Sequence, residues 1–140
     1  MIIERLNSSN VDSALDLCEA CFGEDCNDFN INSVLTKADK YNYCFVAKDK
    51  DLVVGLIVAT PVKTPFDIRP MIYISYVCTH EQYRRQGIAL ALVEYVVSHC
   101  RKKLSAKEFL LHTLKGNEAA DAVYRKAGFT DDVNGFYLHL

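Results

Sequence analysis

The sequence has no run of 18 consecutive apolar residues and little net charge. Without such a run, no membrane-spanning helix is expected. The net charge of -2 argues against a protein that coats nucleic acid, because such proteins are usually strongly basic. The first residues, Met1 to Arg5, lack a charged region followed by an apolar stretch, so no signal peptide is expected. These absences predict a cytoplasmic protein with no membrane and no nucleic acid among its partners.

The cysteines and histidines show no complete metal-binding pattern. The spacing of Cys18, Cys21 and Cys26 resembles half of a zinc site, but no second pair of ligands follows nearby. The four histidines share no metal-like spacing. In a chain with no sign of secretion, the six cysteines are expected to be free thiols, and no metal is predicted.

Half of the 140 residues are hydrophobic, which is enough for the core of one domain over residues 1–140. The turn Lys48–Asp51 predicts a hairpin between two strands, and all three prolines lie in a predicted loop, Pro61 to Pro70. Hairpins early in the chain and strand–helix alternation later predict an α/β (α+β) fold with a mixed, mostly antiparallel central sheet flanked by helices. The predicted strands are 1–6, 43–47, 52–60, 71–79 and 108–114, with 133–140 as a last strand or hairpin arm, and the predicted helices are 11–22, 30–38, 87–103 and 117–127.

The stretch from Val77 to Ala89 joins an apolar strand to a long apolar helix through a short polar turn. The first N–H groups of a helix have no intrahelical partner, and the helix dipole adds positive charge there. Gly87 would let a ligand approach the backbone closely, and Arg84 and Arg85 carry charge suited to phosphate oxygens. The turn therefore indicates a phosphate site, although a solvated helix end with two surface arginines would look the same.

Two motifs together resemble those of the GNAT superfamily of acyl-CoA-dependent N-acyltransferases. Residues 84–89, Arg-Arg-Gln-Gly-Ile-Ala, resemble its pyrophosphate signature, Arg/Gln-x-x-Gly-x-Gly/Ala. Residues 117–129 match its second signature, Asn-x-x-Ala-x-x-x-Tyr-x-x-x-Gly-Phe, at every fixed position. The two occur in the family's order, separated by one helix and one strand, and the resemblance is strong over about Met71 to Phe129.

The resemblance implies a sheet whose two central parallel strands, here 71–79 and 108–114, splay apart to admit the pantetheine arm of acetyl-CoA. A β-bulge in the first strand frees backbone groups that pair with that arm, and a backbone N–H near Val77 stabilises the oxyanion. Asn117 hydrogen-bonds the arm, and Tyr124 is the catalytic residue that protonates the leaving thiolate. A core tyrosine without a chemical role is the alternative for Tyr124. The implied cofactor-binding residues are Val77, Cys78, Thr79, Arg84, Arg85, Gln86, Gly87, Ile88, Ala89, Leu90, Asn117 and Tyr124.

The residue that deprotonates the acceptor amine is left open. Some family members use a glutamate early in the first central strand, but Met71, Tyr73 and Ser75 form one face of this strand and none is a carboxylate. A water relay through Tyr73, Ser75, Tyr76 or His112 is the substitute. Cys78 as a covalent nucleophile is the alternative to direct transfer, but no partner base lies beside it in the sequence.

The resemblance implies an N-acetyltransferase that moves acetyl from acetyl-CoA to a primary amine by direct transfer in a ternary complex. The acceptor, a small molecule or a protein or peptide, is expected on the side of Phe22–Phe29 and Val133–Phe136. Asp25 and Asp28 would attract a cationic amine there, although a merely solvated acidic loop would look the same. An acyl-CoA-binding sensor or interaction module without turnover is the alternative. The acceptor's identity, the acyl chain length and the oligomeric state, with a homodimer as one option, are left open.

Overall fold

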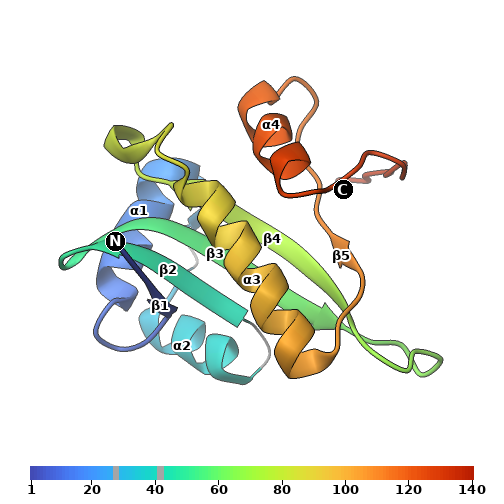
Figure 1. Ribbon diagram of the computed structural model, residues 1–140. Helices are drawn as coiled ribbons and strands as arrows, with labels where there is room; N and C mark the ends of the chain where they lie inside the picture. Colours follow the sequence, from blue (N-terminus) through green and yellow to red (C-terminus); the bar gives the residue numbers. More distant parts are fainter. Residues whose placement is uncertain (27–28, 41–42) are drawn as a thin grey trace.

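A central sheet organises the computed structural model, which describes residues 1–26, 29–40 and 43–140 (Figure 1). Its strands lie in chain order, the first four antiparallel and the last pair parallel. This is the mixed, mostly antiparallel sheet that the sequence predicts. The strands of the described residues are β1 (Ile2–Arg5), β2 (Tyr43–Asp49), β3 (Leu52–Val62), β4 (Met71–Thr79) and β5 (Phe109–Leu110).

Helices cover both faces of the sheet. Helices α1 and α2 pack on one face and α3 crosses the other, while α4, which follows β5 in the chain, contacts α3 (Figure 1). Among the described residues, no helix has the length and apolar character that a membrane crossing requires. The helices are α1 (Val11–Phe22), α2 (Ile31–Lys40), α3 (Ile88–Leu104) and α4 (Glu118–Lys126), with short 3-10 turns η1 (Gly23–Cys26) and η2 (Glu81–Tyr83).

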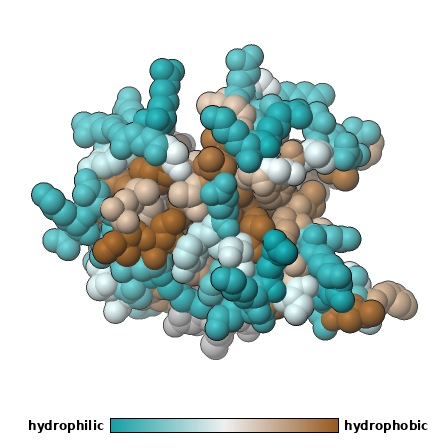
Figure 2. Space-filling model, in the orientation of Figure 1, coloured by the Kyte–Doolittle hydropathy of each residue, from teal (hydrophilic) through white to brown (hydrophobic). Residues whose placement is uncertain are grey.

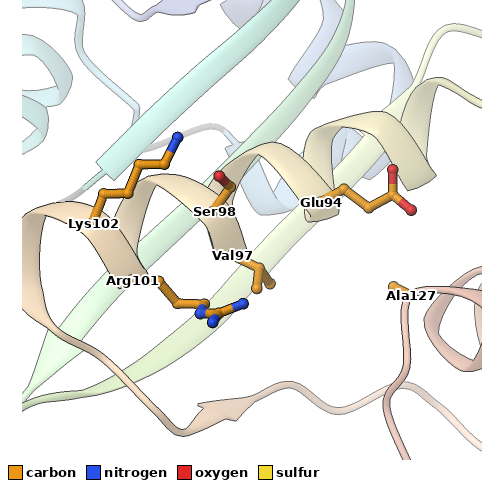
Figure 3. Close-up of a pocket in the computed structure, with 6 residues that line it drawn as sticks. All are labelled: Glu94, Val97, Ser98, Arg101, Lys102 and Ala127. Atoms are coloured by element: carbon orange, nitrogen blue, oxygen red, sulfur yellow. The ribbon is translucent and has the colours of Figure 1, made fainter.

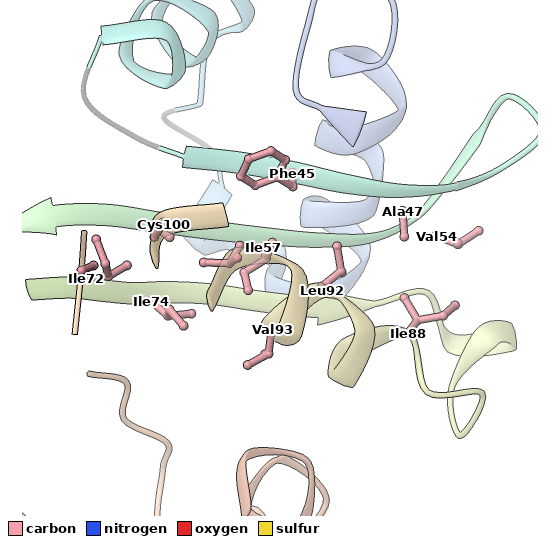
Figure 4. Packing of buried hydrophobic residues seen from close by; sticks show 13 residues of the cluster. Phe45, Ala47, Val54, Ile57, Ile72, Ile74, Ile88, Leu92, Val93 and Cys100 are labelled. Atoms are coloured by element: carbon pink, nitrogen blue, oxygen red, sulfur yellow. The ribbon is translucent and has the colours of Figure 1, made fainter. Parts of the chain in front are cut away.

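The strands alternate between two hydrophobic clusters, one on each face of the sheet. In β2, Phe45 and Ala47 point toward α3, whereas Cys44 and Val46 point toward α1. This period of two is what a strand buried on both faces imposes. Figure 4 shows the α3-side cluster, in which Leu92 and its neighbours on α3 contact side chains of β2, β3 and β4.

Several predicted boundaries are wrong, and three of the errors follow from which segment has a strand partner. The strand predicted over 108–114 is reduced to Phe109–Leu110, because β4 turns away beyond that point. The strand predicted over 133–140 is absent, because these residues pair with no other strand and are exposed. The predicted loop begins later than Pro61, since β3 continues to Val62 and Pro61 lies opposite Ile72.

Gly55 in β3 lets the first turn of α3 lie directly against the sheet. A Cβ at this position would be 2.6 Å from Cγ2 of Ile88 and 2.9 Å from Cδ1 of Leu92. Gly55 also lies opposite Thr79, the last residue of β4. A missing side chain in β3 therefore sets how closely the start of α3 approaches the end of β4.

Replacing Gly55 with alanine should destabilise the protein by about 1–3 kcal/mol, the usual cost of overpacking a filled core. Chemical denaturation of Gly55→Ala, Ile88→Ala and the double variant measures this. If the clash with Ile88 is the cause, the double variant will be more stable than the sum of the two single changes predicts. Strict additivity would show that Gly55 is not needed for this contact.

Candidate active site

A β-bulge interrupts β4 at Ser75. Val58 lies opposite Tyr76 and Ala59 opposite Ile74, so Ser75 is an extra residue with no partner across the pair. Because of the bulge, the alternation of side chains between the two faces of the sheet shifts by one residue. Ile74 and Val77, three residues apart, therefore both point into the α3-side cluster. The bulge that the resemblance implies is therefore present, two residues before Val77.

Beyond the bulge, the edge of β4 that faces β5 is open. The parallel pairing joins Ile72 with Phe109 and Tyr73 with Leu110, and among the described residues no strand pairs with that side of β4 from Ile74 to Thr79. This is the predicted splay of the two central parallel strands. It leaves backbone N–H and C=O groups available to an extended ligand, as the edge of a sheet does for an added strand.

The turn after β4 delivers the chain to the N-terminus of α3. Arg85 and Gly87 both have left-handed backbones, with φ of 62° and 79°. No side chain caps the helix, and the first helical hydrogen bond runs from the N–H of Ala91 to the carbonyl of Gly87. Apart from Gly87 and its two chain neighbours, no heavy atom of the described residues lies within 4 Å of a Cβ built on Gly87. The start of α3 therefore has no side-chain cap, and the space beside Gly87 is open.

Hydrogen bonds at the start of the turn after β4 hold it in place. The N–H of His80 donates to the carbonyl of Val54 at 2.8 Å, and the His80 ring Nδ1 accepts from the N–H of Gln82. The Tyr83 hydroxyl donates to Oδ2 of Asp49 at 2.9 Å, which ties the turn to the β2–β3 hairpin. The turn is therefore anchored before it reaches the two arginines.

Arg84 and Arg85 are exposed, and no ion pair in the described part of the chain involves either of them. An uncapped helix N-terminus with two free guanidinium groups beside it is suited to a phosphate or diphosphate group. Ile88 is buried in the core, while Ala89 and Leu90 are half-buried. Ile88 therefore fixes the helix end rather than offering its side chain to a ligand.

Helix α4 carries the second set of predicted residues. Asn117 caps this helix, its Oδ1 accepting from the N–H of Ala120 at 3.2 Å. Tyr124 is half-buried against the α3-side cluster, next to Phe129, with ring centroids 6.3 Å apart. Burial raises the pKa of Tyr124 above its ordinary value. Its hydroxyl is therefore protonated at neutral pH, as a general acid requires.

Cys78 lies on the face of the sheet away from α3. Its side chain packs in the α1-side cluster, and its hydrogen bond with Cys18 together with burial raises its pKa. A nucleophilic cysteine needs a lowered pKa, because the thiolate is the reactive form. The structure thus gives Cys78 a structural side chain and leaves only its backbone for the cofactor.

All six cysteines are free, and within the described residues no three potential metal ligands come together.

The four candidate relay residues are separated by the bulge. Tyr76 faces the α1 side, where its ring meets that of Phe22 at 5.4 Å, and the Ser75 hydroxyl lies 3.5 Å from the carbonyl of Val58. Tyr73 and His112 lie together: the tyrosine oxygen is 3.3 Å from Nδ1 of the histidine, and their rings stack. Of the four, only this pair joins β4 to the segment after β5.

Two cavities lie outside the turn. One, of about 500 Å³, lies between α3 and the end of α4 (Figure 3). In the same region Figure 2 shows hydrophobic surface beside the hollow below α4. The other, of about 150 Å³, is almost wholly apolar and lies on the α1–α2 side, where Phe29 and Tyr76 contribute to its wall.

This second cavity is on the side predicted for the acceptor. Asp28 and the side chain of Asp25 lie outside what the structure describes, and Val133–Phe136 does not border this cavity.

The family model for the acetyltransferase (GNAT) family matches residues 11–129. The chain belongs to this family. The match includes the turn at Arg84–Leu90 and the helix that carries Tyr124, as well as the first helices, where the sequence showed no motif. Membership of the GNAT family and its characteristic fold are therefore established, as predicted, and the predicted enzyme class is the class of the family.

Proteins similar to this GNAT chain include named acetyltransferases. N-acetyltransferase family 8 member 3 from Mus musculus is 29% identical over 106 residues, which cover 75% of this chain and 46% of the relative. The chain thus spans less than half the length of this relative. A crystal structure of an aminoglycoside acetyltransferase from an uncultured soil metagenomic sample, in complex with sisomicin, is 22% identical, with a TM-score of 0.82 over 99% of this chain and 95% of the other. The structure of AAC(6')-Iy in complex with the bisubstrate analog CoA-S-monomethyl-acetylneamine is 16% identical, with a TM-score of 0.81 over 99% and 97% of the two chains.

Proposed function

We propose that residues 1–140 form one N-acetyltransferase domain, which transfers an acetyl group from acetyl-CoA to a primary amine in a ternary complex. One observation carries the proposal: the open edge of β4, Ile74 to Thr79, leads directly into an uncapped helix N-terminus flanked by Arg84 and Arg85. An extended amide chain that ends in a diphosphate would complement both features at once.

The residues present fit acetyl-CoA at this place. The edge at Val77, Cys78 and Thr79 would pair through backbone atoms with the amides of the pantetheine arm. The turn from Arg84 to Leu90 would hold the diphosphate through N–H groups and the two guanidinium groups. Asn117 would direct its side chain amide to the same arm. Acetyl-CoA supplies an activated acyl group when bound, and the protein's own part is to orient it and move protons.

Tyr124 would donate its proton to the sulfur that leaves, since its hydroxyl stays protonated at neutral pH. A backbone N–H near Val77 would hydrogen-bond the oxygen that gains charge during attack. The Tyr73–His112 pair would take the proton from the amine through water, because it is the one candidate pair that meets at the splay. The face of β4 formed by Met71, Tyr73 and Ser75 carries no carboxylate for this step.

For the acceptor we propose a primary amine that approaches from the α1–α2 side. Tyr76, the residue before Val77, is part of the wall of the apolar cavity there. The α3-side entrance would be taken by the cofactor, and direct transfer needs the amine on the other side of the thioester. Aminoglycosides are bound by one structural neighbour, and amines of small molecules and of peptides are the two classes to compare. The cytoplasmic location remains a prediction.

The decisive assay follows release of free thiol from acetyl-CoA with a panel of acceptors: aminoglycosides, small apolar primary amines, and peptides with a free α-amine or lysine. The proposal requires thiol release that depends on one acceptor class and yields an acetylated product by mass spectrometry. Tight acetyl-CoA binding with no turnover on any class would instead support the alternative, an acyl-CoA-binding sensor. Absence of binding would contradict both.

A further inference from the structure

Four cysteines gather where α1 lies against the end of β4 that leads into η2 (Figure 1). Cys18 on α1 and Cys78 on β4 are buried in the α1-side cluster, and Cys21 on α1 and Cys26 in η1 pack against that cluster. The fold thus brings together thiols from segments that are distant in the sequence. None of these sulfurs has a part in the proposed transfer, so the cluster is a candidate for thiol chemistry of its own.

Cys21 reaches the end of β4 from α1. Its thiol donates to the carbonyl of Thr79 at 3.8 Å, although the two residues are 58 positions apart in the sequence. The thiol of Cys78, the residue before Thr79, has side-chain hydrogen bonds with Cys18 and Cys21. The sulfurs of Cys21 and Cys78 are therefore neighbours across the contact between α1 and β4, as a disulfide between these elements requires.

The two thiols differ in their access to solvent. Cys21 is partly exposed, whereas the side chain of Cys78 is buried. The hydrogen bond with Cys18, together with burial, raises the pKa of Cys78 and so lowers its reactivity toward a dissolved oxidant. An oxidant in solution therefore meets Cys21 first. Cys78 would react second, and its position beside Cys21 makes up for its low thiolate fraction.

Cys18 is the competing thiol on α1. Its hydrogen bond with Cys78 lowers the pKa of Cys18, which favours reaction, but its side chain is only 5% exposed. Oxidation of a cysteine depends on exposure as well as on thiolate character. Burial therefore keeps a dissolved oxidant from Cys18, and the first attack is assigned to Cys21.

We propose that Cys21 and Cys78 form a redox-modification site, at which hydrogen peroxide closes a disulfide between α1 and β4. The sulfur of Cys21 attacks one peroxide oxygen, the O–O bond breaks, and the leaving hydroxide takes the thiol proton to become water. The sulfur of Cys78 then attacks the sulfenic acid on Cys21. The S–O bond breaks, and the second hydroxide leaves as water with the proton of Cys78. One peroxide is reduced to two waters, and the two thiols lose two electrons.

The disulfide would act on the edge of β4 where acetyl-CoA is proposed to pair, and this consequence rests on the proposed function. The sulfurs of a disulfide are about 2 Å apart, closer than those of hydrogen-bonded thiols, so closing the bond draws the end of β4 toward α1. The backbone of Val77, Cys78 and Thr79 would move with it. Acetyl-CoA should bind the oxidised chain about 5–150-fold more weakly, which is the usual size of a coupling between two sites.

Thiol counting and peptide mapping test the site. After treatment with hydrogen peroxide and its removal, the chain should lose two of its six free thiols and regain them with dithiothreitol. Trypsin should release residues 6–37 linked to residues 64–84, the peptides that hold Cys21 and Cys78. A loss of thiols without any link, or a link confined to residues 6–37, overturns the proposal.

Cys21→Ser identifies the partner on α1, because the peptide of residues 6–37 also holds Cys18 and Cys26. The link should be absent in this variant. Cys26→Ser is the matched control, since Cys26 is also partly exposed and packs on the same cluster, and it should keep the link. A link that persists in Cys21→Ser would contradict the assignment. The mapping of the wild-type chain decides the matter even if a variant does not fold.

Calorimetry with acetyl-CoA on the reduced and the oxidised chain tests the consequence. The oxidised wild type should bind more weakly, whereas the affinity of Cys21→Ser should not change on treatment with peroxide. A linked chain that binds acetyl-CoA as tightly as the reduced one would contradict the coupling. A reduced wild-type chain that does not bind acetyl-CoA would instead contradict the proposed function, so the two failures are distinguishable.

Discussion

Tyr124→Phe is expected to lower turnover by about 10²–10⁴-fold while leaving the affinity for acetyl-CoA nearly unchanged, because it removes a proton donor and little packing. The ring of Tyr124 would still contact Phe129 and the α3-side cluster. Single-turnover kinetics on a verified acceptor, with chemistry rate-limiting, measures the effect. Tyr95→Phe on α3 is a matched control, since its ring packs with Phe45 and has no role in the proposed site.

The pH dependence gives the same assignment a second check. Burial raises the pKa of Tyr124, so the protonated, active form persists to higher pH than for an exposed tyrosine and is lost only as the pH rises through the raised value. The wild-type rate should therefore not fall on account of Tyr124 until the pH exceeds about 10. Equal rates for Tyr124→Phe and wild type would make Tyr124 a core residue only.

Gly87→Asp is expected to weaken acetyl-CoA binding by at least about tenfold, which corresponds to 1.4 kcal/mol. The change places a negative charge where the diphosphate is proposed to lie, and charge repulsion near a protein surface reaches a few kcal/mol at contact distance. It also puts a side chain on a backbone with φ of 79°. Isothermal titration calorimetry with acetyl-CoA measures the loss.

The strain of a left-handed backbone must be separated from the loss of the site. Gly23→Asp provides the control, because Gly23 has φ of 60°, has open space around its Cβ position, and follows α1 rather than β4. Its affinity for acetyl-CoA should match the wild type even if its stability falls. Unchanged affinity in a folded Gly87→Asp variant would rule out the turn as the diphosphate site.

Elements whose partners are local could be predicted from the sequence. The limits of α1 and β4 agree with the prediction, because each is a continuous apolar pattern bounded by polar residues. Asn117 and Gly128 frame α4 as a cap and a stop, and Gly128 has the positive φ that such a stop uses. The turn at Gly87 was predictable for the same reason, since its glycine and helix start are adjacent in the chain.

Features that depend on distant segments could not be located from the residues alone. The resemblance implied a bulge in β4, but no glycine or proline marks its position at Ser75, which appears only when β4 is aligned with β3. The meeting of Tyr73 with His112, 39 residues apart, depends on how β4 and β5 are paired. Gly55 did carry a signal, because an isolated glycine in an apolar strand often marks a close approach, but the strand alone does not show that α3 is what approaches.

The extent of β5 and the missing strand over residues 133–140 show the same limit. Residues 108–114 and 133–140 have the composition of strands, yet an extended segment is stable only when a neighbour completes its hydrogen bonds. β4 leaves β5 after Leu110, and residues 133–140 pair with no strand among the described residues. The sequence therefore shows which segments can form strands, and only the pairing decides which of them do.

The central claim is that acetyl-CoA lies along the open edge of β4 and against the start of α3. Amide chemical shifts from two-dimensional NMR, followed as acetyl-CoA is added to the isotope-labelled chain, test this most directly. The account predicts the largest shifts at Ile74–Thr79 and Gln86–Leu90, with little change in β1 and α2. Shifts centred instead on Val97 and Arg101, at the cavity between α3 and α4, with the turn unchanged, would contradict it.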